Sequence, residues 1–177
     1  LPINDGTVRA MDFRQIKTSD EDFGLMVYDP AYKNTASCRS AITYIDGDKG
    51  ILRYRGYPIE QVAARARFTE VCHMLIYGER PDTATLAKFR EDLTYHTLLH
   101  EDMKKFFEGY PPSAHPMAIM ASMVASLSTF YPDNDPALTD LNIVRILAKS
   151  KTIAAFAHKK SIGQPFIYPR NDLSYPA

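Results

Sequence analysis

The sequence is poor in cysteine and has no excess of charge of either sign. Its 177 residues include only two cysteines, Cys38 and Cys72, with no CxxC spacing, so neither a disulfide framework nor a zinc knuckle is indicated. A reducing, cytoplasmic environment is predicted. Lys and Arg together number 21, as do Asp and Glu, and the formal net charge is +0. This balance gives no attraction to nucleic acid or to anionic membranes, and neither is expected as a partner.

Long apolar runs and targeting signals are also missing. Residues 109–132 contain no Asp, Glu, Lys or Arg, but their helical part, residues 116–130, is shorter than the ~20 residues that span a bilayer. We therefore expect a core helix that is buried on all sides and no membrane span. No N-terminal segment of this sequence combines a basic flank, an apolar run and a small-residue cleavage site, and residues 175–177 match no retrieval or peroxisomal tripeptide. These features again predict a cytoplasmic location.

The first fifty-odd residues contain short apolar stretches bounded by turn residues, which is typical of strands. Strands are predicted over residues 25–28, 41–45 and 51–54. The last two are joined by the sequence DGDKG, whose glycines are suited to a tight hairpin.

After Pro58 the apolar period becomes helical, and six helices are expected. Thr69 is predicted to cap the first helix at its N-terminus and Gly78 to end it. Asp82 opens the second, and a third covers residues 101–108. The fourth begins at Pro116, and two separate helices follow Asp140 and Thr152. The tail, residues 164–177, is expected to be irregular, although its aromatic side chains require burial.

Few residues in this pattern indicate chemistry. His96 and His100 lie four apart on an expected helix, a spacing that two zinc ligands can share, but no third ligand is evident and no metal site is predicted. The sequence from His158 to Lys160 either binds an anion or offsets a helix dipole. No nucleophile motif is present. The residues alone therefore predict a mainly α globule with a small β region and name no reaction.

Two motifs early in the chain carry a resemblance to a known family. These two motifs are TASCRS at residues 35–40 and IDGDKGILRYRGYPIE at residues 45–60. A third motif near the end of the chain, SIGQPFIYPRNDLSY, occupies residues 161–175. Together they closely resemble the N-terminal region of citrate synthases, and the resemblance covers nearly the whole chain from Leu25. Among the branches of that family, the chain is most similar to the bacterial hexameric type (type II), which begins with a small antiparallel β region.

This resemblance implies a fold and a domain plan. The chain is expected to be mainly α, a helical fragment of the citrate synthase large domain preceded by a small antiparallel β region. Residues 1–57 would form the N-terminal β-rich region, and residues 58–177 the N-terminal part of the large helical domain. The small domain and the active site are expected to lie outside this chain.

The resemblance also implies an activity. Citrate synthases are acyltransferases that condense acetyl-CoA with oxaloacetate to citrate and free CoA, the entry step of the tricarboxylic acid cycle, without a redox or metal cofactor. The catalytic aspartate, histidines and arginines of the family belong to motifs that this chain lacks. No catalytic residue is therefore assigned, and the chain alone is expected to be inactive. The parent protein is expected to be a homo-oligomer, either a dimer or a hexamer.

One regulatory site of the hexameric branch draws on this part of the sequence. Arg145 and Lys149 lie one helical turn apart, a spacing that suits a phosphate, but an ordinary solvated Arg–Lys face is the alternative. Well-known NADH-sensitive members carry arginine where this chain has Tyr95, so NADH sensitivity is an open question. The residues that match the inhibitory NADH pocket are His96, Thr97, Tyr131, Arg145, Lys149, Asn171 and Asp172.

Two other functions remain open. The chain could be a piece of a 2-methylcitrate synthase, although that sister group typically lacks the β region over residues 7–54. It could also be a non-catalytic helical module that joins full-length enzymes and regulates them. The C-terminus stops within a matched motif, which favours a truncated enzyme over a natural module.

Overall fold

The computed structural model describes residues 1–132 and 135–175, and the chain separates into two compact units, Leu1–Thr43 and Tyr44–Ala177. The second unit is mainly helical and begins with a small antiparallel sheet. The fold class predicted from the sequence is therefore confirmed. The predicted domain boundary after Tyr57 stays a prediction. Over the described ranges, no helix has both the length and the apolar character needed to cross a bilayer.

The first unit has little regular structure. It contains one short 3-10 helix, η1 (Ala10–Gln15). The strand predicted over residues 25–28 is wrong, because this segment has no regular secondary structure and belongs to no sheet. The Leu25 N–H donates to the Ile16 carbonyl at 3.0 Å, and the Tyr28 side chain is 88% exposed. An apolar run forms a strand only where a neighbouring strand supplies a ladder of hydrogen bonds.

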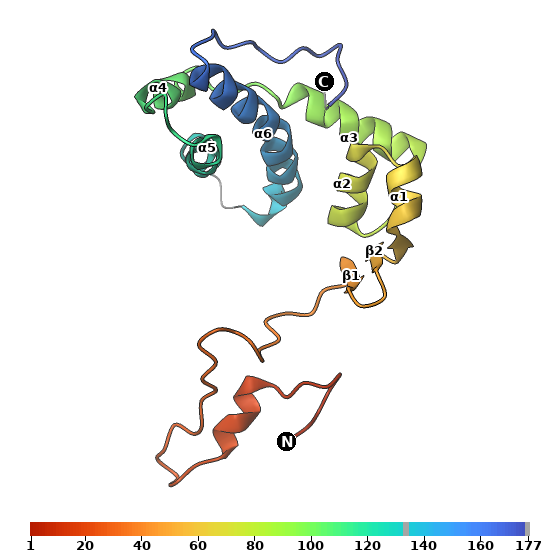
Figure 1. Ribbon diagram of the computed structural model, residues 1–177, viewed down its shortest axis with the longest axis vertical. Helices are drawn as coiled ribbons and strands as arrows, with labels where there is room; N and C mark the ends of the chain where they lie inside the picture. The colour runs from red at the N-terminus through yellow and green to blue at the C-terminus, as the bar shows by residue number, and fades with distance from the viewer. Residues whose placement is uncertain (133–134, 176–177) are drawn as a thin grey trace. The chain divides into compact units, whose positions relative to one another are not determined.

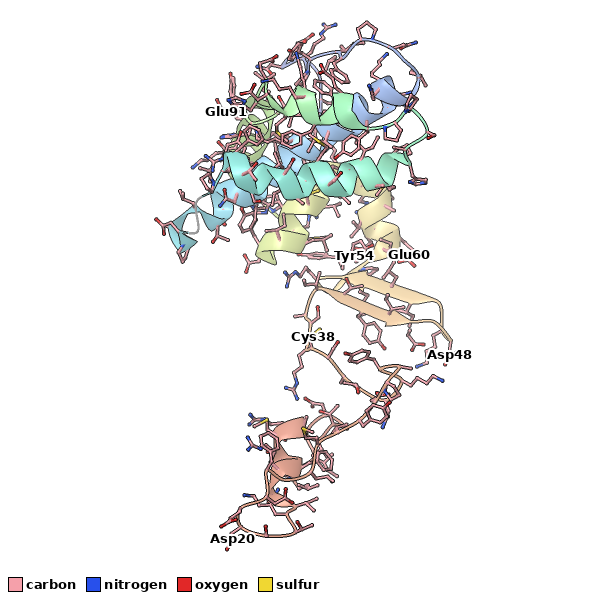
Figure 2. All side chains as sticks on the ribbon, turned by 90° about the vertical axis from the view of Figure 1, so that its left-hand side faces the viewer. Asp20, Cys38, Asp48, Tyr54, Glu60 and Glu91 are labelled. Atoms are coloured by element: carbon pink, nitrogen blue, oxygen red, sulfur yellow. The ribbon has the colours of Figure 1, made fainter. Side chains whose placement is uncertain are left out.

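Three strands lead into the second unit, in the order β1 (Thr43–Asp46), β2 (Ile51–Tyr54) and β3 (Tyr57–Pro58). Only Thr43, the first residue of β1, is counted with the first unit. The predicted hairpin between β1 and β2 is confirmed, with Asp48 at its tip (Figure 2) and Gly50 at a φ of 64°. A turn at Arg55 and Gly56 then joins β2 to β3.

Three helices follow: α1 (Ile59–Arg65), α2 (Phe68–Tyr77) and α3 (Thr83–Tyr95). Gly78 ends α2 at a φ of 94°, and the Asp82 carboxylate caps α3 by accepting the Thr85 N–H at 2.7 Å, both as predicted. Thr69 is not the cap of α2, because it lies inside that helix. Its hydroxyl is buried and accepts from Arg90 Nε at 3.1 Å.

The C-terminal half contains α4 (Met103–Gly109), α5 (Pro116–Phe130), a 3-10 turn η2 (Pro136–Leu138) and α6 (Thr139–Ser161). The two helices expected after Asp140 and Thr152 are one helix of 23 residues. Residues 139–161 contain no glycine or proline to end it. Thr152 does not cap a new helix either, because its hydroxyl donates to the Thr97 carbonyl at 2.8 Å.

Helix α5 is not buried on all sides. Its core stripe consists of Ile119, Met123 and Leu127, which recur every fourth residue and are all buried. The opposite face is exposed, including Ala121 and Ala125. The absence of charge on this helix therefore did not correspond to burial within the chain.

Helix α6 closes both hydrophobic clusters of the second unit, and Figure 1 shows it between α5 on one side and α3 on the other. One cluster comprises Met103, Phe107, Ile119, Met123, Leu127, Ile153, Phe156 and Ala157. The other comprises Phe89, Leu93, Val144 and Ala148.

The irregular tail returns along these helices. Phe166 stacks on Phe156 with ring centroids 4.5 Å apart and planes 5° from parallel. Tyr175 stacks on Phe68 at 5.3 Å, and its hydroxyl donates to the Leu147 carbonyl at 2.6 Å. These two aromatic side chains fix the tail.

Candidate functional site

Three of the residues expected to bind NADH lie side by side. Arg145 and Lys149 lie one turn apart on α6, and Tyr131 directly follows α5. The Arg145 guanidinium carbon is 4.7 Å from the Tyr131 ring centroid, and Lys149 Nζ is 5.2 Å from it. Both cations therefore contact the face of one aromatic ring, a geometry that favours positive charge.

The Lys149 side chain is turned into the protein and is only 4% exposed. Its ammonium group donates to the carbonyl of His96 at 3.1 Å and to the carbonyl of Leu98. These carbonyls follow the C-terminal end of α3, where the helix dipole favours a cation. Two of the three ammonium donors are therefore engaged within the fold.

His96 and Thr97 contact the same end of α3 with their own side chains. His96 Nδ1 lies 2.7 Å from the Asp92 carbonyl oxygen. The Thr97 hydroxyl is buried and donates to the Thr94 carbonyl at 3.2 Å. Both side chains satisfy carbonyl groups of the last turn, which would otherwise lack partners.

Arg145 is the more available cation of the pair. It is half-buried, and one guanidinium nitrogen donates to Asn142 Oδ1 at 3.0 Å. Among the described residues no ion pair neutralises its charge. The guanidinium therefore keeps donors with which it can meet an external anion.

Asn171 and Asp172 lie in the tail. Asp172 accepts two hydrogen bonds from Arg170, and these bonds lower the pKa of its carboxyl group. It lines a cavity of about 600 Å³ together with Arg67, Phe68 and Arg90. Across residues 1–132 and 135–175, no hydrogen bond or ion pair joins Asn171 or Asp172 to the other five residues, so their part in an effector site stays a prediction.

His96 lines a different cavity, of about 440 Å³, between α2, α3 and α6. Two carboxylates, those of Asp92 and Asp140, line this cavity together with one lysine, Lys88. Burial and the nearby Asp140 carboxylate raise the pKa of the Tyr77 hydroxyl there. An excess of carboxylates disfavours phosphate in this cavity.

The expected helix that would carry both His96 and His100 is absent. Helix α3 ends at Tyr95, and His100 lies in the following loop, where its Nδ1 accepts the Asp102 N–H at 3.1 Å. Within the part of the chain that the structure describes, no three His, Cys, Asp or Glu side chains gather to hold a metal ion.

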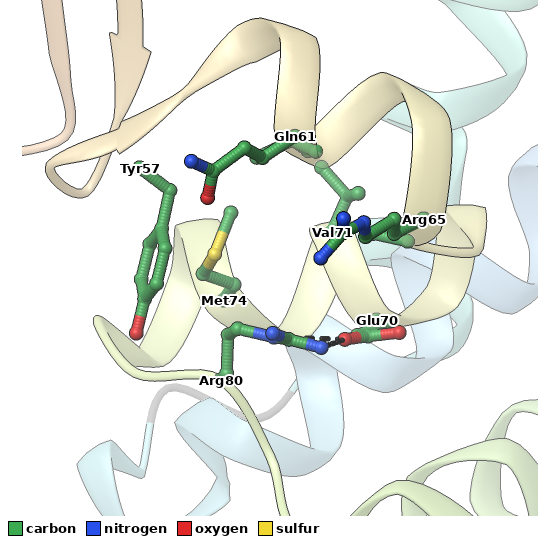
Figure 3. A pocket seen from close by; sticks show the side chains of 9 residues that line it. Tyr57, Gln61, Arg65, Glu70, Val71, Met74 and Arg80 are labelled. Atoms are coloured by element: carbon green, nitrogen blue, oxygen red, sulfur yellow. Dashed lines mark hydrogen bonds and ion pairs between the residues drawn. The ribbon is translucent and has the colours of Figure 1, made fainter.

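A further cavity was not apparent in the sequence. It lies between the end of β3, α1 and α2, and Figure 3 shows its polar rim over an apolar floor. Its lining residues come from β3, α1, α2 and the loops that follow the two helices, and they form no linear motif, so no spacing in the sequence indicates it. They are Tyr57, Gln61, Val62, Arg65, Ala66, Glu70, Val71, Met74 and Arg80.

Known proteins match most of this chain. The family model described as "Citrate synthase, C-terminal domain" matches residues 31–177. Citrate synthase 1 of Mycobacterium tuberculosis is 54% identical over 155 residues, which are 85% of this chain and 36% of that protein. Citrate synthase of Dictyostelium discoideum is 46% identical over 186 residues, covering 99% of this chain and 36% of that protein. The chain thus spans about a third of the length of these relatives.

Solved structures share the fold. Citrate synthase from Thermotoga maritima superposes with a TM-score of 0.70 at 26% identity, covering 84% of this chain and 39% of that one. The enzyme from Thermoplasma acidophilum gives a TM-score of 0.72 at 22% identity, covering 80% of this chain and 38% of that one. The match over residues 31–177, supported by both curated relatives, shows that the chain belongs to the citrate synthase family.

Proposed function

We propose that this chain is part of a citrate synthase, an acyltransferase that condenses acetyl-CoA with oxaloacetate to give citrate and CoA. The observation that carries the proposal is the 54% identity to a curated citrate synthase over 155 residues. The substrates are supported by the related Thermoplasma acidophilum structure, which is a ternary complex with carboxymethyl coenzyme A and oxaloacetate.

The proposed role of this chain within the parent enzyme is structural support. Three of its histidines already use a ring nitrogen on neighbouring backbone: His96 on Asp92, His100 on Asp102 and His115 on Met117. None of these side chains is assigned to the reaction. We therefore propose that the 177-residue chain by itself is inactive. We also propose that it forms the N-terminal part of the large domain, whereas the matching family model carries the name of the C-terminal domain.

Two measurements on purified protein test this role. Intact mass distinguishes a 20.0 kDa species from a longer parent. Release of CoA from acetyl-CoA in the presence of oxaloacetate is then measured for each species. We expect activity from the longer parent alone. Citrate formation by a verified 20.0 kDa species would disprove the proposed division of roles, and an inactive intact parent would disprove the proposed reaction.

We further propose that NADH regulates the parent enzyme through Arg145. The support is the position of this arginine over Tyr131, with guanidinium donors that no carboxylate neutralises among the described residues. Replacement by alanine is expected to weaken NADH inhibition about tenfold, as loss of a hydrogen bond to a charged group does. The NADH titration compares Arg145→Ala with Arg53→Ala, in which an exposed arginine of β2 is the control. Equal inhibition of both variants and the parent would remove Arg145 from the site.

The remaining features of the proposal concern assembly and location. A homo-oligomer, a dimer or the hexamer of the type II branch, is supported by the exposed, uncharged face of α5. A cytoplasmic location is supported by the resemblance to the bacterial branch. Neither a 2-methylcitrate synthase nor a separate regulatory module gains an observation in its favour.

A further inference from the structure

The cavity between β3, α1 and α2 is small and partly open. Its volume is about 60 Å³. Because a single water molecule needs ~10–15 Å³ of such space, the cavity holds about four to six non-hydrogen atoms. This size excludes nucleotides and coenzymes. It suits a very small metabolite.

The floor of this cavity is apolar. Val62 and Met74 are buried, and Met74 is only 2% exposed. Val71 lies beside them on α2 (Figure 3). Such a floor favours a short hydrocarbon chain over a second charged group.

The rim carries one uncompensated positive charge. Arg80 donates from Nε and Nη2 to Glu70 Oε1, at 3.0 and 2.7 Å, so this ion pair neutralises both groups. Figure 3 shows the Arg65 guanidinium on the opposite side of the cavity from Tyr57. In the described part of the chain, Arg65 has no hydrogen bond or ion pair of its own. Its planar group matches a carboxylate in shape and charge.

We propose that this cavity binds a short-chain monocarboxylate with two to about four carbon atoms. The carboxylate accepts hydrogen bonds from the Arg65 guanidinium, and the Gln61 amide lies on the same rim as a further donor. The alkyl chain rests on Val71 and Met74. This inference does not depend on the citrate synthase reaction, because the cavity and its residues are contained in the 177-residue chain.

The probe for the proposal is butyrate, and NMR follows its titration at constant ionic strength into the chain carrying Ala125→Glu, because the exposed uncharged face of α5 would make the unmodified chain self-associate at NMR concentrations. We expect saturable shifts of the Val62 and Val71 methyl signals and of Met74. Butyramide, which has the same shape without the charge, should bind about tenfold more weakly or not at all. Octanoate should also bind more weakly, because it exceeds the volume. Equal shifts with butyramide, or linear shifts identical to those with chloride, would overturn the proposal.

Variants locate the binding. Arg65→Gln should weaken butyrate binding about tenfold or more, because it removes the charge from an exposed position. Arg67→Gln is the matched control, since Arg67 lines the neighbouring cavity with Asp172 and should leave binding unchanged. Val71→Thr, which makes the floor more polar, should lower the preference for butyrate over formate. The role of this cavity would be disproved if the Arg65→Gln chain bound butyrate as tightly as the chain that retains Arg65. Equal losses of butyrate affinity in the Arg65→Gln and Arg67→Gln chains would disprove it as well.

Discussion

At the scale of single residues, Arg55 combines an unusual backbone conformation with a helix contact. Its φ is 48° and that of Gly56 is 86°, which matches the two positive values of a two-residue hairpin turn. The Arg55 side chain then donates from Nε and Nη2 to the Leu75 carbonyl near the C-terminus of α2, at 3.2 and 2.6 Å. The turn therefore fastens the sheet to the helix.

Two substitutions at Arg55 separate these effects. Arg55→Ala loses the bonds to Leu75 and keeps the left-handed strain, so we expect it to lower the free energy of unfolding by about 1.5–3 kcal/mol. Arg55→Gly loses the same bonds but relieves the strain, and it should be about 1 kcal/mol more stable than the alanine variant. Urea unfolding measures both. Equal stabilities of the two variants would mean that the turn is not strained.

The cap of α3 predicts a dependence on pH. The hydrogen bond from the Thr85 N–H lowers the pKa of Asp82 below its usual value of about 3.9. Its stabilising contribution is thus complete above the unfolded-state pKa and is lost as the pH falls through the lower folded-state value. Asp82→Asn retains a cap that does not titrate. As the pH falls from about 5 to about 2, we expect the melting temperature of the chain with Asp82 to decrease relative to that of the Asp82→Asn variant.

Asp48→Asn is the control for this comparison. Asp48 lies at the tip of the β1–β2 hairpin and caps no helix (Figure 2). The same relative change in melting temperature in the Asp48→Asn chain would assign the effect to general loss of negative charge.

At the scale of helices, α6 is anchored through polar contacts as well as apolar ones. Lys149 and Thr152 together engage the carbonyls of three consecutive residues, 96–98. Through these hydrogen bonds the buried Lys149 side chain links α6 to the segment that follows α3. Its removal leaves two carbonyl groups without a donor, which is costly in a buried setting.

Lys149→Met tests this link, because methionine keeps much of the volume without the donors. We expect the free energy of unfolding to drop by about 2–3 kcal/mol. Lys88→Met, on the exposed surface of α3, should change it by less than about 0.5 kcal/mol. Similar values for the two variants, measured by urea unfolding, would show that the Lys149 contacts contribute nothing net.

The sequence predicted the features that depend on neighbouring residues and missed those that depend on residues distant in the chain. The hairpin, the cap at Asp82, the end at Gly78 and the start at Pro116 all depend on neighbours in the chain, and the sequence predicted each of them. Thr69 was assigned wrongly as a cap because Arg90, 21 residues away, engages its hydroxyl. The helix start expected at Thr152 was wrong for a similar reason, because the Thr152 hydroxyl donates to the distant Thr97 carbonyl.

The candidate effector site shows the same limit. The spacing of Arg145 and Lys149 predicted that they lie one helical turn apart, and the structure shows both beside Tyr131, which only the family resemblance had grouped with them. It did not indicate that Lys149 is buried against the carbonyls after α3, because those carbonyls lie about fifty residues earlier. The small cavity beside Arg65 was missed altogether, since three elements must fold together before it exists.

At the scale of the whole molecule, the exposed face of α5 predicts self-association. Met117 is 63% exposed, and Ala121 and Ala125 lie on the same uncharged helix. Apolar surface of this kind usually marks contact with another protein chain. We expect the 177-residue chain to associate or aggregate at micromolar concentration.

Ala125→Glu places a charge on this face and should shift the sedimentation velocity profile towards monomer. Ala87→Glu, at an exposed position of α3, is the control and should leave the profile unchanged. A monodisperse 20.0 kDa monomer of the unmodified chain would contradict the prediction.

The position of α6 in the chain also has a consequence for biosynthesis. Because α6 completes both hydrophobic clusters, the cluster around Phe89 cannot close until Ala148 has left the ribosome, and the cluster around Phe107 cannot close until Ala157 has done so. Before then, Phe107, Met123 and Phe89 lack their contacts with the α6 residues of these clusters. Until α6 has been synthesised, the nascent chain exposes these apolar side chains, so we expect a pause in translation before α6 to prolong the time in which a chaperone can bind them.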